Sequence, residues 1–189
     1  MPVSLQIIIG SVRPARVGLP VAGWIESVAR GDDRFEVTLV DLAEVDLPFL
    51  DEPEQPHLGR YTHEHTKAWS RKVDAADAFV FVMPEYNAGY SPALKNALDF
   101  LSAEWKHKAV GMVSYGGVSG GQRGAQQLKT IMLQLNLMPV PAAVPIPFVS
   151  AMINDDGDFE PSEPVATGAG RMLDSIVEWD EMLRGKREG

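Results

Sequence analysis

The 189-residue sequence contains no cysteine, which excludes disulfide bonds, a thiolate nucleophile and cysteine-ligated metal sites. It also lacks any run of about 20 apolar residues, the length that a membrane-spanning helix requires. After Met1 and Pro2 the chain enters a strand-like segment, and no basic leader with a cleavage pattern precedes it. We therefore expect a soluble, cytoplasmic protein that has no membrane partner.

Positive charge is scarce as well. The chain has 17 lysines and arginines against 26 aspartates and glutamates, and its formal net charge is −9. A surface dominated by negative charge repels nucleic acids, so we expect no nucleic-acid partner. The hydrophobic content of 45% is ordinary for a globular protein, and the length suits one well-buried core. We predict a single domain over residues 1–189, with a frayed tail at 184–189.

Several motifs of known enzymes are also missing. The chain has neither the Gly-x-Gly-x-x-Gly pattern of dinucleotide-binding folds nor the Gly-Lys-Ser/Thr of a Walker loop. Ser119 lies in a glycine-rich loop without the pattern of a hydrolase nucleophile. His63 and His65 are two residues apart, a spacing at which side chains diverge on a helix. The acidic run 155–158 lacks the spacing of a calcium loop. We predict no metal site and no catalytic residue from the protein.

What the sequence does contain is a regular alternation of two patterns. Apolar runs predict strands at 3–9, 35–42, 78–83, 109–114 and 140–144. Apolar residues at helical spacing predict helices at 19–29, 62–76, 92–101, 122–137 and 166–183. Ser91 is a candidate N-cap, and Pro92 suits the first helical position. This alternation predicts an α/β fold, a three-layer, flavodoxin-like, doubly wound sheet of five parallel strands in the order 2-1-3-4-5.

In that topology, ligands bind beyond the carboxyl ends of the strands. The strand order reverses between the first and third strands, which places loops 10–18 and 84–91 side by side, with 114–121 next to them. Loop 10–18 offers a serine hydroxyl, two arginines and a helix N-terminus, which suit a phosphate, although a plain turn with solvated arginines is the alternative. Loop 114–121 has four glycines, which would let a planar ligand approach its backbone N–H groups or would simply make the loop flexible.

Taken together, these loops resemble those of one known family. The motifs are Gly-Ser-x-Arg-x-x-Arg from Gly10, Pro-Glu-Tyr-Asn from Pro84 followed by Leu-Lys-Asn-Ala-Leu-Asp, and Ser-x-Gly-Gly-x-x-Gly-Gly from Ser114. They resemble the NADPH-dependent FMN reductase family, which includes quinone reductases, azoreductases and enzymes credited with chromate reduction. The resemblance covers about residues 3–145.

The resemblance implies a non-covalently bound FMN that is reduced by NADPH or NADH and then reduces a small-molecule acceptor, such as a quinone, free flavin or azo compound, by a ping-pong mechanism. It implies that Ser11, Arg13 and Arg16 hold the phosphate, with backbone contacts from Val17 and Gly18. The residues implied at the isoalloxazine ring are Pro84, Glu85, Tyr86 and Asn87 on one side and Ser114, Tyr115, Gly116 and Gly117 at the pyrimidine edge.

Residues 47–53 form an apolar, proline-containing stretch that would be unusual on the surface of a monomer. Related proteins pack their subunits there, so we expect a homodimer or homotetramer. Two other functions stay open, a flavodoxin-like electron carrier without nicotinamide activity and a scaffold that binds no flavin. The two arginines of loop 10–18 argue against the carrier, because flavodoxin phosphate loops are rich in serine and threonine.

Overall fold

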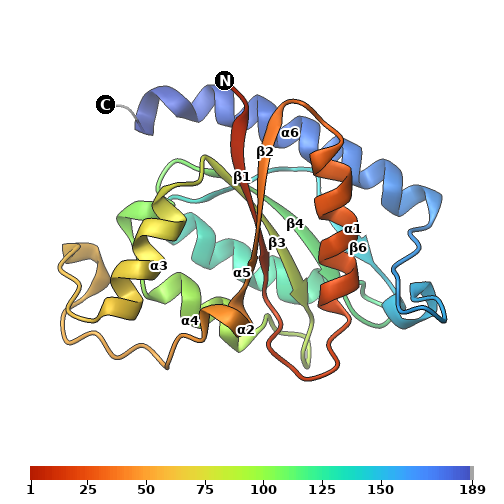
Figure 1. The fold of residues 1–189 in the computed structure, drawn as a ribbon, viewed down its shortest axis with the longest axis horizontal. Coiled ribbons are helices and arrows are strands. Elements are labelled where there is room, and N and C mark those ends of the chain that lie inside the picture. The colour runs from red at the N-terminus through yellow and green to blue at the C-terminus, as the bar shows by residue number, and fades with distance from the viewer. Residues whose placement is uncertain (188–189) are drawn as a thin grey trace.

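The computed structural model describes residues 1–187, and a parallel β-sheet lies at its centre (Figure 1). The strands are β1 (Val3–Ile9), β2 (Phe35–Asp41), β3 (Ala78–Pro84), β4 (Ala109–Tyr115), β5 (Met138–Pro139) and β6 (Val144–Ile146). They lie in the order β2-β1-β3-β4-β5, with β6 also paired to β4, and every pairing between them is parallel. The predicted flavodoxin-like α/β fold and its strand order are confirmed.

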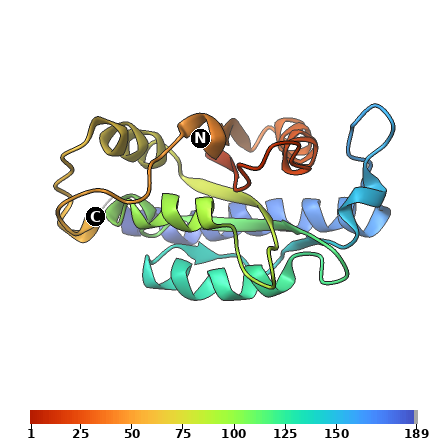
Figure 2. The ribbon, with the colours of Figure 1, turned by 90° about the horizontal axis from the view of Figure 1, so that it is seen from below.

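Helices cover both faces of the sheet. They are α1 (Gly18–Arg30), α2 (Leu42–Val45), α3 (Glu64–Asp74), α4 (Pro92–Asp99), α5 (Gln122–Gln134) and α6 (Glu163–Arg187), with short 3-10 turns η1 (Pro56–Leu58), η2 (Ala103–Trp105) and η3 (Val149–Met152). Figure 1 shows α1 on one side of β1 and β2 and α3 on the other. Seen from below in Figure 2, α5 lies at the edge of the molecule opposite to α1 and α3.

Each face of the sheet has its own hydrophobic core. Leu5, Ile7 and Ile9 of β1 pack with α1 and α6, whereas Ile8 packs with α3, α4 and α5. This division follows from the period of two along a strand, which turns successive side chains to opposite faces. Because helices cover both faces, β3 and β4 are buried along their whole length.

The fifth strand differs from the prediction of a single strand at 140–144. Its place beside β4 is shared by the short strands β5 and β6, so the sheet has six strands rather than five. Prolines explain the interruption, because Pro139, Pro141 and Pro145 have no N–H to donate to a neighbouring strand.

The end of the chain is helical. Helix α6 continues through Arg187 and so includes residues 184–187, for which the sequence predicts a frayed tail. The side chains of Arg184 and Arg187 both form ion pairs with Asp180, which is fully buried. Residues 188–189 of that predicted tail lie outside the described residues.

Ser91 precedes α4, as predicted, but its side chain does not cap the helix. Its hydroxyl donates a hydrogen bond to the carbonyl of Gly10 instead. This bond ties the loop after β3 to the end of β1, so the two loops that flank the expected site are joined directly.

Candidate cofactor-binding site

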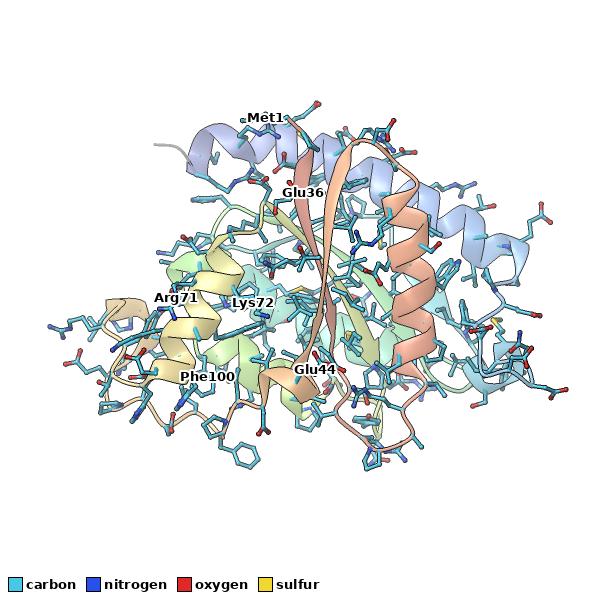
Figure 3. The ribbon with its side chains drawn as sticks, in the orientation of Figure 1. Met1, Glu36, Glu44, Arg71, Lys72 and Phe100 are labelled. Carbon is cyan, nitrogen blue, oxygen red and sulfur yellow. The ribbon has the colours of Figure 1, made fainter. Side chains whose placement is uncertain are left out.

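The three predicted loops meet at the carboxyl edge of the sheet, the lower edge in Figure 1. Figure 3 shows Glu44 at this edge and Met1 and Glu36 at the opposite one. A cavity at these loops measures about 500 Å³. Two other surface hollows have similar volumes, about 560 and 430 Å³. The residues that line the cavity at these loops are Arg13, Val17, Pro84, Glu85, Tyr86, Tyr115, Gly116, Gly117, Phe148, Val149, Ser150 and Ala151. A volume of this size suits a small organic ligand.

The loop between β1 and α1 carries backbone donors without partners. From Ser11 to Val17, no backbone N–H donates to any group within residues 1–187. Helix α1 begins at Gly18, so its own first N–H groups and the positive end of its dipole lie next to them. Arg13 is exposed and has no ion-pair partner in the described chain, and its guanidinium lies 5.9 Å from the centre of the Tyr86 ring. These groups can hold a phosphate.

Arg16 is not available in the same way. Its guanidinium forms an ion pair with Asp41 at the end of β2, and both side chains are largely buried. Asp41 also accepts a hydrogen bond of 2.9 Å from the N–H of Ala43 and so caps α2. Arg16 therefore braces the loop against β2, while Arg13 is the cation that lines the cavity. The pairing of Arg16 with Asp41 was not predicted from the sequence.

Three hydroxyl groups come together beside this loop. Those of Ser11 and Tyr86 share a hydrogen bond of 2.8 Å. The Tyr115 hydroxyl is buried without a hydrogen-bond partner in residues 1–187, although Ser11 lies near enough to lower its pKa. Burial is the larger influence and raises the pKa of Tyr115, so the hydroxyl keeps its proton. A Cβ at Gly18 would lie 2.6 Å from the Tyr115 oxygen, so this close approach requires glycine.

Residues 86–89 form a tight turn. Tyr86 and Gly89 exchange backbone hydrogen bonds of 3.0 and 2.9 Å, and Asn87 and Ala88 between them have φ values of 49° and 66°. Two successive residues of this kind form a type I′ turn, which asparagine favours. Asn87 is exposed and does not line the cavity, whereas Pro84, Glu85 and Tyr86 do.

Glu85 lines the cavity, but its carboxylate is engaged by α5. It accepts hydrogen bonds from the Ser119 hydroxyl at 2.8 Å and from the N–H groups of Arg123 and Gly124 at 2.9 and 3.3 Å. Burial opposes its ionisation, but these hydrogen bonds and the Arg123 charge together hold the pKa of Glu85 below its ordinary value. Such a carboxylate positions α5 and is no proton donor near neutral pH.

The glycine-rich loop is more ordered than its composition suggests. The Ser114 hydroxyl donates to the Gly120 carbonyl at 2.8 Å, and Ser114 lies outside the cavity lining. The N–H of Gly116 donates to the Ile146 carbonyl at 3.3 Å. The N–H of Gly117 has no acceptor in the described chain. Of the two glycine donors expected at a pyrimidine edge, only that of Gly117 is available.

The sequence did not reveal a fourth wall of the cavity, residues 148–151. This segment is fixed to the glycine-rich loop, because the N–H groups of Phe148 and Val149 donate to the carbonyls of Gly117 and Gly116 at 3.0 and 3.3 Å. The sequence signal that could have revealed this wall is the aromatic residue Phe148 directly after Pro147, and this signal is weak without the fold.

Two other regions bear on alternative functions. His63 lies before α3 in an extended conformation, so its ring stacks on that of His65 at 5.2 Å, and the predicted divergence is wrong. Over residues 1–187, no three His, Asp or Glu side chains are arranged to hold a metal ion. None of the helices in this part of the chain combines the length and apolar character needed to cross a bilayer.

Comparison with known proteins shows the family of this chain. Residues 3–151 match the sequence profile described as NADPH-dependent FMN reductase. The chain belongs to this family. Its relatives include the NAD(P)H-dependent FMN reductase C4B3.06c of Schizosaccharomyces pombe, 43% identical, with 97% of this chain and 92% of that protein covered. Another is the NAD(P)H-dependent FMN reductase ntnL of Nectria sp, 34% identical, with 94% of each chain covered.

Among solved structures, the flavoenzyme NAD(P)H:(acceptor) oxidoreductase FerB of Paracoccus denitrificans matches with a TM-score of 0.75. The match covers 96% of this chain and 98% of that one at 23% identity, so it bears on the fold alone. This likeness agrees with the flavodoxin-like fold described above.

Proposed function

We propose that this chain is an FMN-dependent NAD(P)H oxidoreductase, and that residues 1–187 act as one FMN-binding domain. The observation that carries the proposal is the set of unpartnered N–H groups of residues 11–13 and 15–17, beside Arg13 at a cavity of about 500 Å³. The phosphate of FMN supplies the acceptor atoms and negative charge that these groups need. Family membership supports FMN as the ligand that carries this phosphate.

The residues present fit this cofactor, with three changes to the expected roles. Arg13, the N–H groups of 11–17 and the Ser11 hydroxyl would hold the phosphate. Arg16 would keep the loop in place through Asp41 rather than by its own contact. The ring would lie where Pro84, Tyr86 and the Gly117 N–H line the cavity, while Asn87 and Ser114 lie outside the lining.

Bound FMN would supply the redox chemistry, taking a hydride from NAD(P)H and passing electrons to an acceptor. The chain's own residues would bind and orient the cofactor. Glu85 fixes the loop after β3 to the glycine-rich loop and the start of α5. The nicotinamide and the acceptor would occupy the same cavity in turn, which is a ping-pong mechanism. Relatives named NAD(P)H:quinone oxidoreductase and FMN-dependent NADPH-azoreductase support quinones and azo compounds as acceptors.

The test is an absorbance spectrum of the protein after incubation with FMN and desalting, followed by anaerobic addition of NADPH and then NADH. The proposal predicts retained flavin that is bleached by one or both nucleotides, and the faster one is the preferred donor. Retained flavin that neither nucleotide bleaches would support an electron carrier, which the net charge of −9 would suit for docking to basic partners. Failure to retain flavin would contradict both functions.

We also propose that the protein is a homodimer or homotetramer. Phe49 is 86% exposed and Leu50 is exposed beside it, yet the loop is held firmly, because the Asn96 side chain bonds the Pro48 carbonyl at 2.7 Å and the Leu50 N–H at 3.0 Å. A second cavity of about 560 Å³ adjoins Phe49. A fixed apolar surface of this kind is typical of an interface. Light scattering at micromolar concentration should give a multiple of the chain mass, and a monomer mass would contradict this.

A further inference from the structure

Phe148 is a cavity residue to which the proposed function gives no part. Its side chain is 60% exposed although it is large and apolar. Its backbone has φ 49° and ψ 42°, the left-handed region that bulky residues rarely adopt. A phenylalanine that is both exposed and conformationally unfavourable contributes little to folding, so its position calls for another explanation.

The neighbouring backbone holds Phe148 firmly in this conformation. Its N–H donates to the Gly117 carbonyl at 3.0 Å, and its carbonyl accepts from the Ala151 N–H at 2.8 Å. Val149, the next residue, is buried and anchors the segment in the core around α6. Unfavourable backbone conformations persist where surrounding contacts impose them, and they concentrate at binding sites.

The position of the Phe148 side chain points to a ring-binding role. It lines the same cavity as Tyr86, Pro84 and the free N–H of Gly117. Of the other lining residues in this wall, Val149 is buried, and Ser150 and Ala151 are small and exposed, so Phe148 provides its large exposed apolar surface. Figure 2 shows the chain after this wall standing out from the body of the molecule on the side of α1, which leaves the wall at the periphery.

We propose that the Phe148 ring forms one side of the acceptor subsite and favours planar acceptors with conjugated rings, such as naphthoquinones, by stacking on them. Aromatic pairs gain from offset stacking beyond simple burial of area. An acceptor such as ferricyanide, which has no planar ring, gains nothing from this contact. The inference rests on the proposed function, because the acceptor must reach the bound cofactor.

The test compares three variants. Phe148→Asn removes the ring but keeps a residue that tolerates the left-handed conformation, so the fold should be preserved. Phe148→Tyr keeps the ring. Met182→Asn on α6, where the side chain is 58% exposed, is the matched control for loss of an exposed apolar side chain.

Each variant is measured in three ways. Quenching of flavin fluorescence gives the FMN dissociation constant. Titration with 2-naphthoate, a planar ligand that the enzyme does not reduce, gives a second dissociation constant from the shift in flavin absorbance. Steady-state assays give KM and kcat for 2-methyl-1,4-naphthoquinone and for ferricyanide.

We expect Phe148→Asn to raise the naphthoate dissociation constant and the quinone KM about 3- to 10-fold, with FMN affinity and the ferricyanide kinetics unchanged. Phe148→Tyr and Met182→Asn should behave as the wild type. Unchanged naphthoate binding, an equal loss with ferricyanide, or a changed oligomeric mass in Phe148→Asn would overturn the inference. A wild-type protein that neither retains FMN nor responds to NAD(P)H would instead contradict the proposed function, and the inference with it.

Discussion

The two ends of the parallel sheet are both polar, but their polar groups are satisfied differently. At the amino end, the Lys108 ammonium donates to the carbonyls of Val73 and Asp74 at 2.9 and 3.0 Å, and Arg187 pairs with buried Asp180. At the carboxyl end, the N–H groups of 11–17 and the cation of Arg13 have no partner in the described chain. Buried polar groups in native proteins are normally paired, as those at the amino end are. The amino end therefore holds the fold together, whereas we propose that the carboxyl end binds a ligand.

The largest expected effect is the loss of stability on removing Asp180 at the amino end of the sheet. Asp180→Ala removes the carboxylate that two arginines share, so we expect the free energy of unfolding to fall by about 3 to 5 kcal/mol. Urea unfolding measures this loss. Glu181→Ala, at the exposed next position, should change it by less than about 0.5 kcal/mol. A small effect of Asp180→Ala, or an equal effect of both variants, would show that the amino end is not held by this pair.

The counterpart at the carboxyl end is Arg13→Glu. It removes a cation from the proposed phosphate site and adds repulsion, so FMN affinity should fall by about 3 kcal/mol, roughly 100-fold, with the unfolding free energy nearly unchanged. Arg71→Glu is the control, because it makes the same change of charge on α3 (Figure 3). Fluorescence titration checks both, and unaltered FMN affinity in folded Arg13→Glu would remove Arg13 from the site.

A further prediction for the amino end concerns Lys108 and the pH dependence of stability. Burial lowers the pKa of Lys108 from 10.5 to about 8, more than the nearby carboxylates raise it. Between these values the unfolded chain holds a proton that the folded chain has released, so stability rises with pH in this window, and below it the penalty stays constant.

We therefore expect the unfolding free energy of the wild type, relative to Lys108→Met, to rise by no more than about 3 kcal/mol from about pH 8 to about pH 10.5. The difference between the two proteins cancels the other ionising groups. Urea unfolding across this range measures it, and a difference that stays flat with pH would mean that Lys108 titrates as an ordinary lysine.

The smallest expected effect probes the packing under the phosphate loop. Gly18→Ala would bring a methyl group against the Tyr115 hydroxyl, at a cost of about 1 to 2 kcal/mol in stability. Tyr115→Phe removes that oxygen, so the double variant should regain most of the loss. Gly23→Ala in the same helix meets no atom within 4 Å and should be neutral or stabilising. Additive losses in the double variant would exclude the contact.

The sequence predicts most of the sheet because the signals are local. The run 78–83 is apolar throughout, and such a run forms a strand buried on both faces, as β3 is. The region 140–144 could not be predicted as well, because strand pairing there depends on where the prolines, which have no N–H to donate, fall relative to β4. The ion pairs of Arg184 and Arg187 could not be predicted, because only the tertiary structure brings their partner Asp180 into a buried position.

The location of the candidate site follows from topology, but the details do not. Strand order alone brings loops 10–18 and 84–91 together. The pairing of Arg16 with Asp41 depends on the end of β2 lying beside the loop, and the strand order could have indicated it. The wall at Phe148 could not be predicted, because it depends on how a proline-rich segment returns to Gly116 and Gly117.

The central claim is that the unpartnered groups at the carboxyl end bind a phosphate, and it is tested most directly by comparing two ligands of the wild-type protein. FMN and riboflavin share the isoalloxazine ring and differ in the phosphate alone. Fluorescence titration of the flavin-free protein gives both dissociation constants. We predict that FMN binds at least about 100-fold more tightly than riboflavin. Equal affinities would contradict the claim.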